Sequence, residues 1–241
     1  MFRRLKKVLT QDKAPDTGRA TRKDGAVWIN TNVDHDANPQ DGSPSRVWRD
    51  GAGVQGMLQD KHWKLERTTA SRNYISGEEI RGRADIAVDP QVSVIIMNRS
   101  LKELLEKRAY ALYTDSVETE ASPTLMEEMR WLALYPQAGW ESLPDSFWHR
   151  YAVMTSHRAY AMSWVTPGLA DLLMTWPEAA LGVDVPFILM VMRGKVHLRM
   201  QLTPADAGTL DHITQLFTNA AQSAIDVFAD NSGESAKLLN K

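Results

Sequence analysis

The stretch FILMVMRGKVHLRMQL, residues 187–202, decides the fold because it has the pattern of two strands joined by a tight turn. Residues 187–193 are apolar at almost every position, whereas residues 196–202 alternate apolar and polar side chains. Gly194 and Lys195 stand between them, and glycine at the first central position of a two-residue loop favours a type II′ turn. The stretch therefore predicts a β-hairpin.

The turn also sets which residues of the hairpin face each other. The expected pairs are Arg193 with Val196, Val191 with Leu198, Leu189 with Met200 and Phe187 with Leu202. On the reverse face lie Ile188, Met190 and Met192 of the first strand, beside His197, Arg199 and Gln201 of the second. Alternation places the second strand near an edge or near solvent. The stripe of Ile188, Met190 and Met192 lies either beneath another layer or in a binding surface.

The residues around the hairpin predict further strands and helices. Strands are expected at 64–68, 79–88, 92–98, 109–119 and 147–155, and the third is expected to be central because Val94, Ile95 and Ile96 are apolar on both faces. Helices are expected at 100–108, 122–135, 156–164, 166–176 and 203–230. These elements predict an α+β fold, in which helices pack on a largely antiparallel sheet.

The chain divides into three parts by composition. Only six of the 51 residues from 10 to 60 are Leu, Ile, Val or Phe, too few to offset the entropy lost on ordering. We therefore expect residues 1–62 to form a long, extended or partly disordered leader. A single domain is expected at 63–230, followed by a tail at 231–241.

The first nine residues have the pattern of a short basic amphipathic helix. The apolar side chains fall on one side of the helical wheel and the basic ones on the other. Such a helix could dock on a partner or touch an anionic membrane surface, or it could be a frayed terminus or pack on its own domain. Docking would use Phe2, Arg3, Arg4, Leu5, Lys6, Lys7 and Leu9.

Composition excludes several classes of function. A net charge of -2 and a pI near 6.3 argue against broad nucleic-acid binding. The chain has no cysteine, which excludes disulfides, thiolate metal sites and a cysteine nucleophile. The longest apolar run, residues 185–192, is too short for a membrane span, and no signal peptide is evident. A cytoplasmic protein is expected, with residues 1–9 as a peripheral membrane contact if there is one.

Two motifs suggest a bound group, but neither has the context that it needs. The residues from Asp34 resemble a calcium loop, yet Pro39 stands where glycine is required. Gly51, Gly53 and Gly56 have the spacing of a dinucleotide-binding turn without a convincing strand before it or helix after it. No two histidines lie three or four residues apart on one helix. We therefore expect no cofactor and no metal.

The best polar constellation surrounds an expected strand-to-helix turn. It comprises His149, Tyr151, His157 and Arg158. His157 and Arg158 with the free amides of a helix start could hold an anion, although both side chains could equally be solvated residues of a first turn. This constellation supports the hypothesis of a small-ligand or anion-binding enzyme.

Tryptophan is abundant, with eight residues in the chain. Tryptophans often carry the energy of protein interfaces, although they also close the cores of α+β domains. The predicted interaction surface comprises Ile188, Met190, Met192, Trp148, Trp164 and Trp176. The favoured hypothesis is a non-enzymatic interaction or assembly protein of a bacterial type, a scaffold or adaptor that binds a protein partner or itself.

Overall fold

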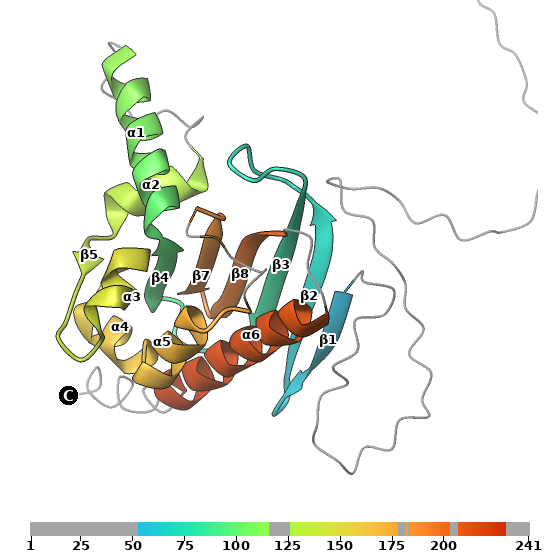
Figure 1. Ribbon diagram of the computed structural model, residues 1–241. Helices are drawn as coiled ribbons and strands as arrows, with labels where there is room; N and C mark the ends of the chain where they lie inside the picture. The colour runs from blue at the N-terminus through green and yellow to red at the C-terminus, as the bar shows by residue number, and fades with distance from the viewer. Residues whose placement is uncertain (1–52, 116–125, 178–181, 183, 203–206, 230–241) are drawn as a thin grey trace, which may run out of the picture. The chain divides into compact units, whose positions relative to one another are not determined.

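The structure is a computed structural model that describes residues 53–115, 126–177, 182, 184–202 and 207–229. Its centre is one eight-stranded sheet in which all neighbouring strands are antiparallel, in the order β1-β2-β3-β8-β7-β4-β6-β5 (Figure 1). The strands are β1 (Gly53–Leu58), β2 (Lys61–Thr69), β3 (Glu78–Asp85), β4 (Ser93–Asn98), β5 (Gln137–Ala138), β6 (Tyr151–Thr155), β7 (Phe187–Met192) and β8 (Lys195–Leu202).

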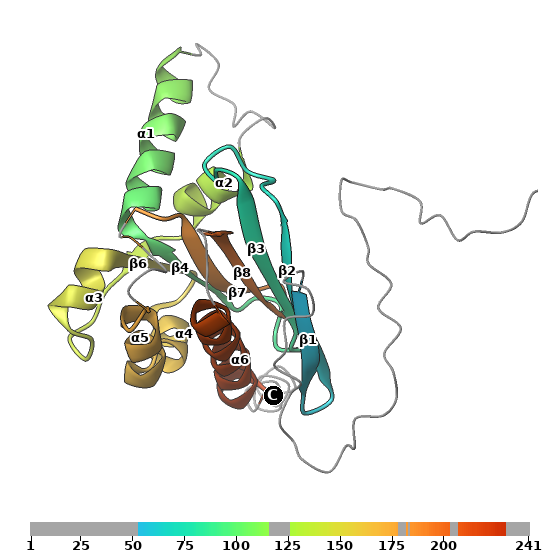
Figure 2. The ribbon, with the colours of Figure 1, turned by 45° about the vertical axis from the view of Figure 1, so that its right-hand side comes forward.

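Helices cover both faces of this sheet, which confirms the predicted α+β class. They are α1 (Arg99–Asp115), α2 (Glu127–Leu134), α3 (Asp145–Arg150), α4 (Arg158–Trp164), α5 (Pro167–Met174) and α6 (Ala207–Phe228). The larger hydrophobic cluster lies under α3 to α6, and a smaller one lies under α1 and α2 on the opposite face. Figure 2 shows α4, α5 and α6 together, while α1 extends away from the sheet.

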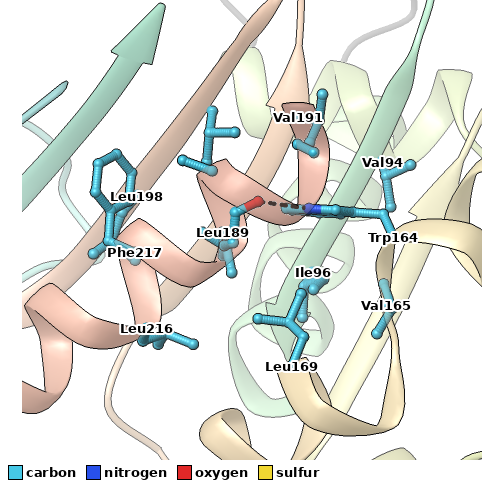
Figure 3. Close-up of a cluster of buried hydrophobic side chains, with 14 of the residues drawn as sticks. Val94, Ile96, Trp164, Val165, Leu169, Leu189, Val191, Leu198, Leu216 and Phe217 are labelled. Carbon is cyan, nitrogen blue, oxygen red and sulfur yellow. Dashed lines mark hydrogen bonds between the residues drawn. The ribbon is translucent and has the colours of Figure 1, made fainter. Parts of the chain in front are cut away.

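The larger core packs against α6. The buried residues of this helix recur every three or four positions, which places one stripe of α6 against the sheet and against α4. Trp164 of α4 is fully buried, and its indole Nε1 donates a hydrogen bond to the carbonyl of Ala220 at 2.9 Å (Figure 3). The bond joins the two helices through a satisfied polar group in the core.

The hairpin forms as predicted, but its turn and register differ. Met192 pairs with Lys195 and Val191 with Val196, so the two loop residues are Arg193 and Gly194. Their φ angles are 54° and 72°, and two positive φ values make this a type I′ turn instead of type II′. The pairing is displaced by two residues from the prediction, which leaves every side chain on its expected face.

Two expectations about the positions of strands have opposite outcomes. β4 is central and buried at all six residues, as predicted from its continuous apolar run. The second strand was expected near an edge or near solvent, and the edge alternative is wrong, because β8 pairs with β3 and β7. The solvent alternative agrees with the structure, since the face that carries His197, Arg199 and Gln201 is only half-buried.

Two predicted strands are wholly or partly helical instead. The strand expected at 109–119 is wrong as far as the structure describes it, because α1 continues to Asp115 and Ala109 packs against the hydrophobic cluster that contains Leu105 of the same helix. Residues 147–150 belong to α3, and only 151–155 form a strand. Phe147 and Tyr151, four residues apart, both enter the core with ring centroids 5.4 Å apart. A separation of four residues fits the alternation of a strand as well as the period of a helix, so the sequence pattern alone predicted a strand.

The folded region also begins earlier than the predicted 63–230. Its first strand is β1, and Gly56 there stands opposite Trp63 of β2. A Cβ at Gly56 would lie 3.0 Å from the indole, so glycine makes room for that side chain. Of the three glycines with the spacing of a dinucleotide-binding turn, Gly53 and Gly56 therefore belong to a strand, and Gly51 lies outside the described residues. The N-terminal helix, the leader to residue 52 and the tail at 231–241 lie outside the described residues.

Candidate functional site

The outer edge of β5 offers backbone groups to a partner. β5 is the last strand of the sheet and pairs only with β6 among the described strands. The amide of Thr155 donates to the carbonyl of Pro136 at 3.2 Å. Because inward and outward pairs alternate in an antiparallel ladder, the next residue, Gln137, directs its N–H and C=O away from β6. Gln137 and Gly139 are both exposed, and a Cβ at Gly139 would meet no atom within 4 Å.

Two adjoining pockets follow this edge. The larger has a volume of about 680 Å³ and the smaller about 360 Å³, and Gln137, Ala138, Gly139 and Arg158 line both. Because they share these residues and are both wide open to solvent, the two pockets form one shallow depression along β5, which we call the β5 recess. The larger pocket is completed by Arg99, Trp140, Glu141, Leu143, Asp145 and Trp148, and the smaller by Pro136, Thr155 and Ser156.

A pair of tryptophans forms the aromatic wall of the larger pocket. Trp140 and Trp148 meet edge to face, with centroids 4.9 Å apart and planes at 84°. Trp148 also packs at 5.1 Å against Phe147, which is fully buried. The short helix α3 thus anchors one aromatic residue in the core and presents the next one, half-buried, to the recess.

Two arginines contribute positive charge to the β5 recess. Arg99 donates from Nε and Nη2 to the carbonyl of Trp148 at 3.0 and 2.6 Å, which fixes the orientation of its guanidinium. Arg158, the exposed first residue of α4, lines both pockets. Within the described residues, neither arginine forms an ion pair. Glu141 and Asp145 also line the larger pocket, whereas Arg158 is the only charged residue in the described part of the chain that lines the smaller one.

The structure does not bring the predicted polar constellation together. Tyr151 is fully buried, where it donates to the carbonyl of Leu173 at 2.8 Å, and burial raises the pKa of its hydroxyl. His149 is exposed on α3, and its Nδ1 lies 2.7 Å from the carbonyl of Asp145. His157 is exposed at the N-cap of α4, beyond the other end of β6 from Tyr151. Of the four residues, only Arg158 lines the recess.

The predicted interaction surface is largely core. Ile188 and Met192 are buried and Met190 is half-buried, all within the cluster beneath α1 and α2. Trp164 is buried between α4 and α6, as described above. The stripe and Trp164 therefore pack the interior and do not form an exposed surface.

The other two tryptophans of that surface are half-buried. Trp176 packs on the larger core, and its Nε1 donates to the hydroxyl of Tyr151 at 3.1 Å. Trp148 is the one predicted interaction residue that lines the β5 recess.

Sequence reasoning missed a buried charged network on the opposite face. Glu128 of α2 is fully buried, and its Oε1 accepts hydrogen bonds from Arg72 Nε at 2.6 Å, Tyr74 Oη at 2.9 Å and Arg199 Nη1 at 2.7 Å. Burial alone would raise the pKa of this carboxyl, but the hydrogen bond and charge of Arg72 hold it below its usual range. The buried Glu79 of β3 accepts from Ser71 and lies 3.8 Å from Arg199.

This network attaches α2 to the sheet and to the β2–β3 connection. In the sequence, Glu127-Glu128 is only an adjacent acidic pair, and nothing local shows that the second glutamate points inward. The network belongs to the packing of the fold, because its charges are paired with one another.

The described residues give no support to a metal site or a membrane span. No three His, Asp or Glu side chains in that part of the chain are grouped so that they could hold a metal ion. None of the helices that it contains combines the length and the apolar character needed to cross a bilayer.

Comparison with known proteins gives a distant structural likeness. No protein-family model and no curated protein matches the sequence. The crystal structure of the mycobacterial trehalose monomycolate transport factor A, TtfA, is similar over 71% of this chain and 70% of that one, with a TM-score of 0.39 and 9% identity. A likeness at this level carries no argument about the function of this chain.

Proposed function

We propose that this chain is a non-enzymatic interaction protein, a scaffold or adaptor, that binds an extended segment of a partner protein along the β5 recess. The observation that carries the proposal is the edge of β5, which no other described strand covers, beside a recess that contains two tryptophans and two arginines that form no ion pair with described residues.

The backbone of β5 supports binding by strand addition. An extended peptide that joins a sheet edge gains main-chain hydrogen bonds, while neighbouring pockets select its side chains. Gln137 offers both an N–H and a C=O on the outer edge. A two-residue strand provides few such bonds, so the pockets must supply most of the affinity and the edge the orientation of the peptide.

The composition of the recess also favours a protein partner. Tryptophan and arginine are the side chains that most often dominate binding energy at protein interfaces. Two exposed hydrophobic residues are close to lining residues in the sequence: Leu134, 69% exposed, ends α2 two residues before Pro136, and Met162, 46% exposed, follows Arg158 by one turn of α4.

The enzyme hypothesis has less support. It depended on four polar residues that would meet in one cleft, and only Arg158 lines the recess. Self-association and a peripheral membrane contact through residues 1–9 stay predictions.

A library of random linear peptides, displayed and selected on the full chain, tests the proposal. Gln137→Pro removes the outward N–H without touching the hydrogen bonds to β6, whereas Gln137→Ala keeps that N–H and removes only the side chain. We expect selected peptides to bind the wild type and Gln137→Ala alike and to bind Gln137→Pro about tenfold or more weakly. No enrichment on the wild type, or equal binding to Gln137→Pro, would contradict strand addition.

A second measurement does not depend on how Gln137→Pro folds. N-methylation at alternate positions of a selected peptide blocks the hydrogen bonds of one strand edge only. Methylation of one alternate set is expected to abolish binding, and methylation of the other set to be tolerated. Equal tolerance of both sets would show that the peptide does not add as a strand.

A further inference from the structure

We infer that the bound segment carries an acidic side chain, which enters the smaller pocket of the β5 recess and pairs with Arg158. This inference rests on the proposed function and names the chemistry of the partner.

The smaller pocket carries positive charge. Among the described residues, Arg158 is the only charged one that lines this pocket, and its guanidinium forms no ion pair with any of them. Arginines of the sheet strands are paired instead, for example Arg67 with Glu78 and Arg83 with Asp85 at 3.2 Å. A guanidinium presents a planar set of donors that matches a carboxylate in a two-point hydrogen bond. A carboxylate from outside would supply the missing partner.

The two pockets differ in the balance of their charges. Glu141 and Asp145 line the larger pocket together with Arg99 and Arg158, so its lining charges cancel, and the guanidinium of Arg99 is already held by the carbonyl of Trp148. In the smaller pocket an acidic side chain would meet Arg158 without a neighbouring carboxylate among the residues that line it. Stronger attraction in the smaller pocket than in the larger would fix which end of the segment lies where.

A strand sets a fixed spacing between the side chains of the bound segment. Side chains on one face of an added strand recur every second residue, about 7 Å apart. The two pockets adjoin along Gln137, Ala138 and Gly139, so an acidic side chain beside Arg158 would direct a neighbouring side chain of the same face toward the tryptophan pair. We therefore expect an apolar or aromatic residue there.

The test uses peptides selected on the wild-type chain. We expect an enriched Asp or Glu, and we expect exchange of that residue for Asn or Gln to weaken binding about tenfold. Arg158→Glu should weaken binding of the acidic peptide by at least as much. A peptide with Lys in place of the acidic residue should bind the Arg158→Glu variant again. Arg130→Glu, an exposed arginine of α2 outside the recess, is the control for total charge and should bind as the wild type does.

The outcomes separate this inference from the proposed function. Selected peptides that depend on Gln137 but show no acidic preference, or that ignore the Arg158 exchange, would overturn the inference and leave strand addition standing. A selection that yields no peptide would overturn both. The Asp→Asn exchange in the peptide tests the pairing on the unmodified protein, so the result does not depend on how the Arg158 variants fold.

Discussion

Removing the charge of Glu128 should weaken the packing of α2 far more than removing the charge of its neighbour. The substitution Glu128→Gln keeps the shape of the side chain but replaces a buried carboxylate that accepts from Arg72, Tyr74 and Arg199. Glu127→Gln is the matched control, because that partly exposed carboxylate only approaches Arg72 at 4.0 Å and Arg193 at 3.8 Å.

The size of the effect follows from those contacts. Hydrogen bonds to a charged group contribute about 1.5–3 kcal/mol each, against about 1 kcal/mol for neutral ones. In Glu128→Gln the amide oxygen can still accept hydrogen bonds, although it no longer carries charge. Arg72 is partly solvated, and Arg199 retains its ion pair with Glu79. The expected loss is therefore about 2–4 kcal/mol in the free energy of unfolding. The control should lose less than about 0.5 kcal/mol, as exposed pairs do.

Urea unfolding at pH 7 measures both variants, with the m-value as a check that the denatured state is unchanged. The folded-state pKa of Glu128 lies below its usual value of 4.5, so the carboxylate contributes stability above that pH and loses it as the pH falls through the lower value. The difference between wild type and Glu128→Gln should therefore shrink in acid below about pH 4.5. Equal stability of Glu128→Gln and Glu127→Gln, or a difference that is the same at low pH, would refute the reasoning.

Two further predictions concern other parts of the sheet. Gly82→Ala should destabilise the fold by about 1–3 kcal/mol, because the new Cβ would lie 2.8 Å from side-chain atoms of Leu65, Leu198 and Phe217. Thermal unfolding measures this loss, and an unchanged Tm would contradict the close packing. Burial and nearby positive charge lower the pKa of His197 to about 4 from 6.5, so the unfolded state takes up the proton first and stability should fall as the pH drops from about 6.5 toward 4. His197→Gln should flatten that dependence in unfolding curves, and an equally steep dependence would show that His197 does not cause it.

Elements with a continuous pattern could be predicted from the sequence. The residues buried in β4 and α6 are the ones that the apolar run and the helical stripe indicate, and the hairpin forms around Gly194. β1 could not be recognised from its own residues. The role of Gly56 there is to leave room for the indole of Trp63, which lies on the next strand. The start of α3 was hidden because Phe147 and Tyr151 satisfy a helical and an alternating pattern at once.

The candidate site was harder to predict because its residues come from separate elements. Trp148 and Arg158 were singled out, one as an aromatic anchor and one as an anion ligand, but nothing local joins them. Their common site depends on β5, whose two residues carry no pattern of their own. Arg99 was not recognised, since only its contact with the carbonyl of Trp148 places it at the recess.

The walls of the β5 recess are continuous with two of the most deeply buried strands. Arg99 directly follows the last residue of β4, and Arg158 comes three residues after the end of β6. The strands hold the backbone of these walls in place, so most of the conformational entropy lost on association would fall on the segment and on exposed side chains such as Arg158. Affinity could then be increased by stiffening the ligand, for instance by cyclisation, without any change to the protein.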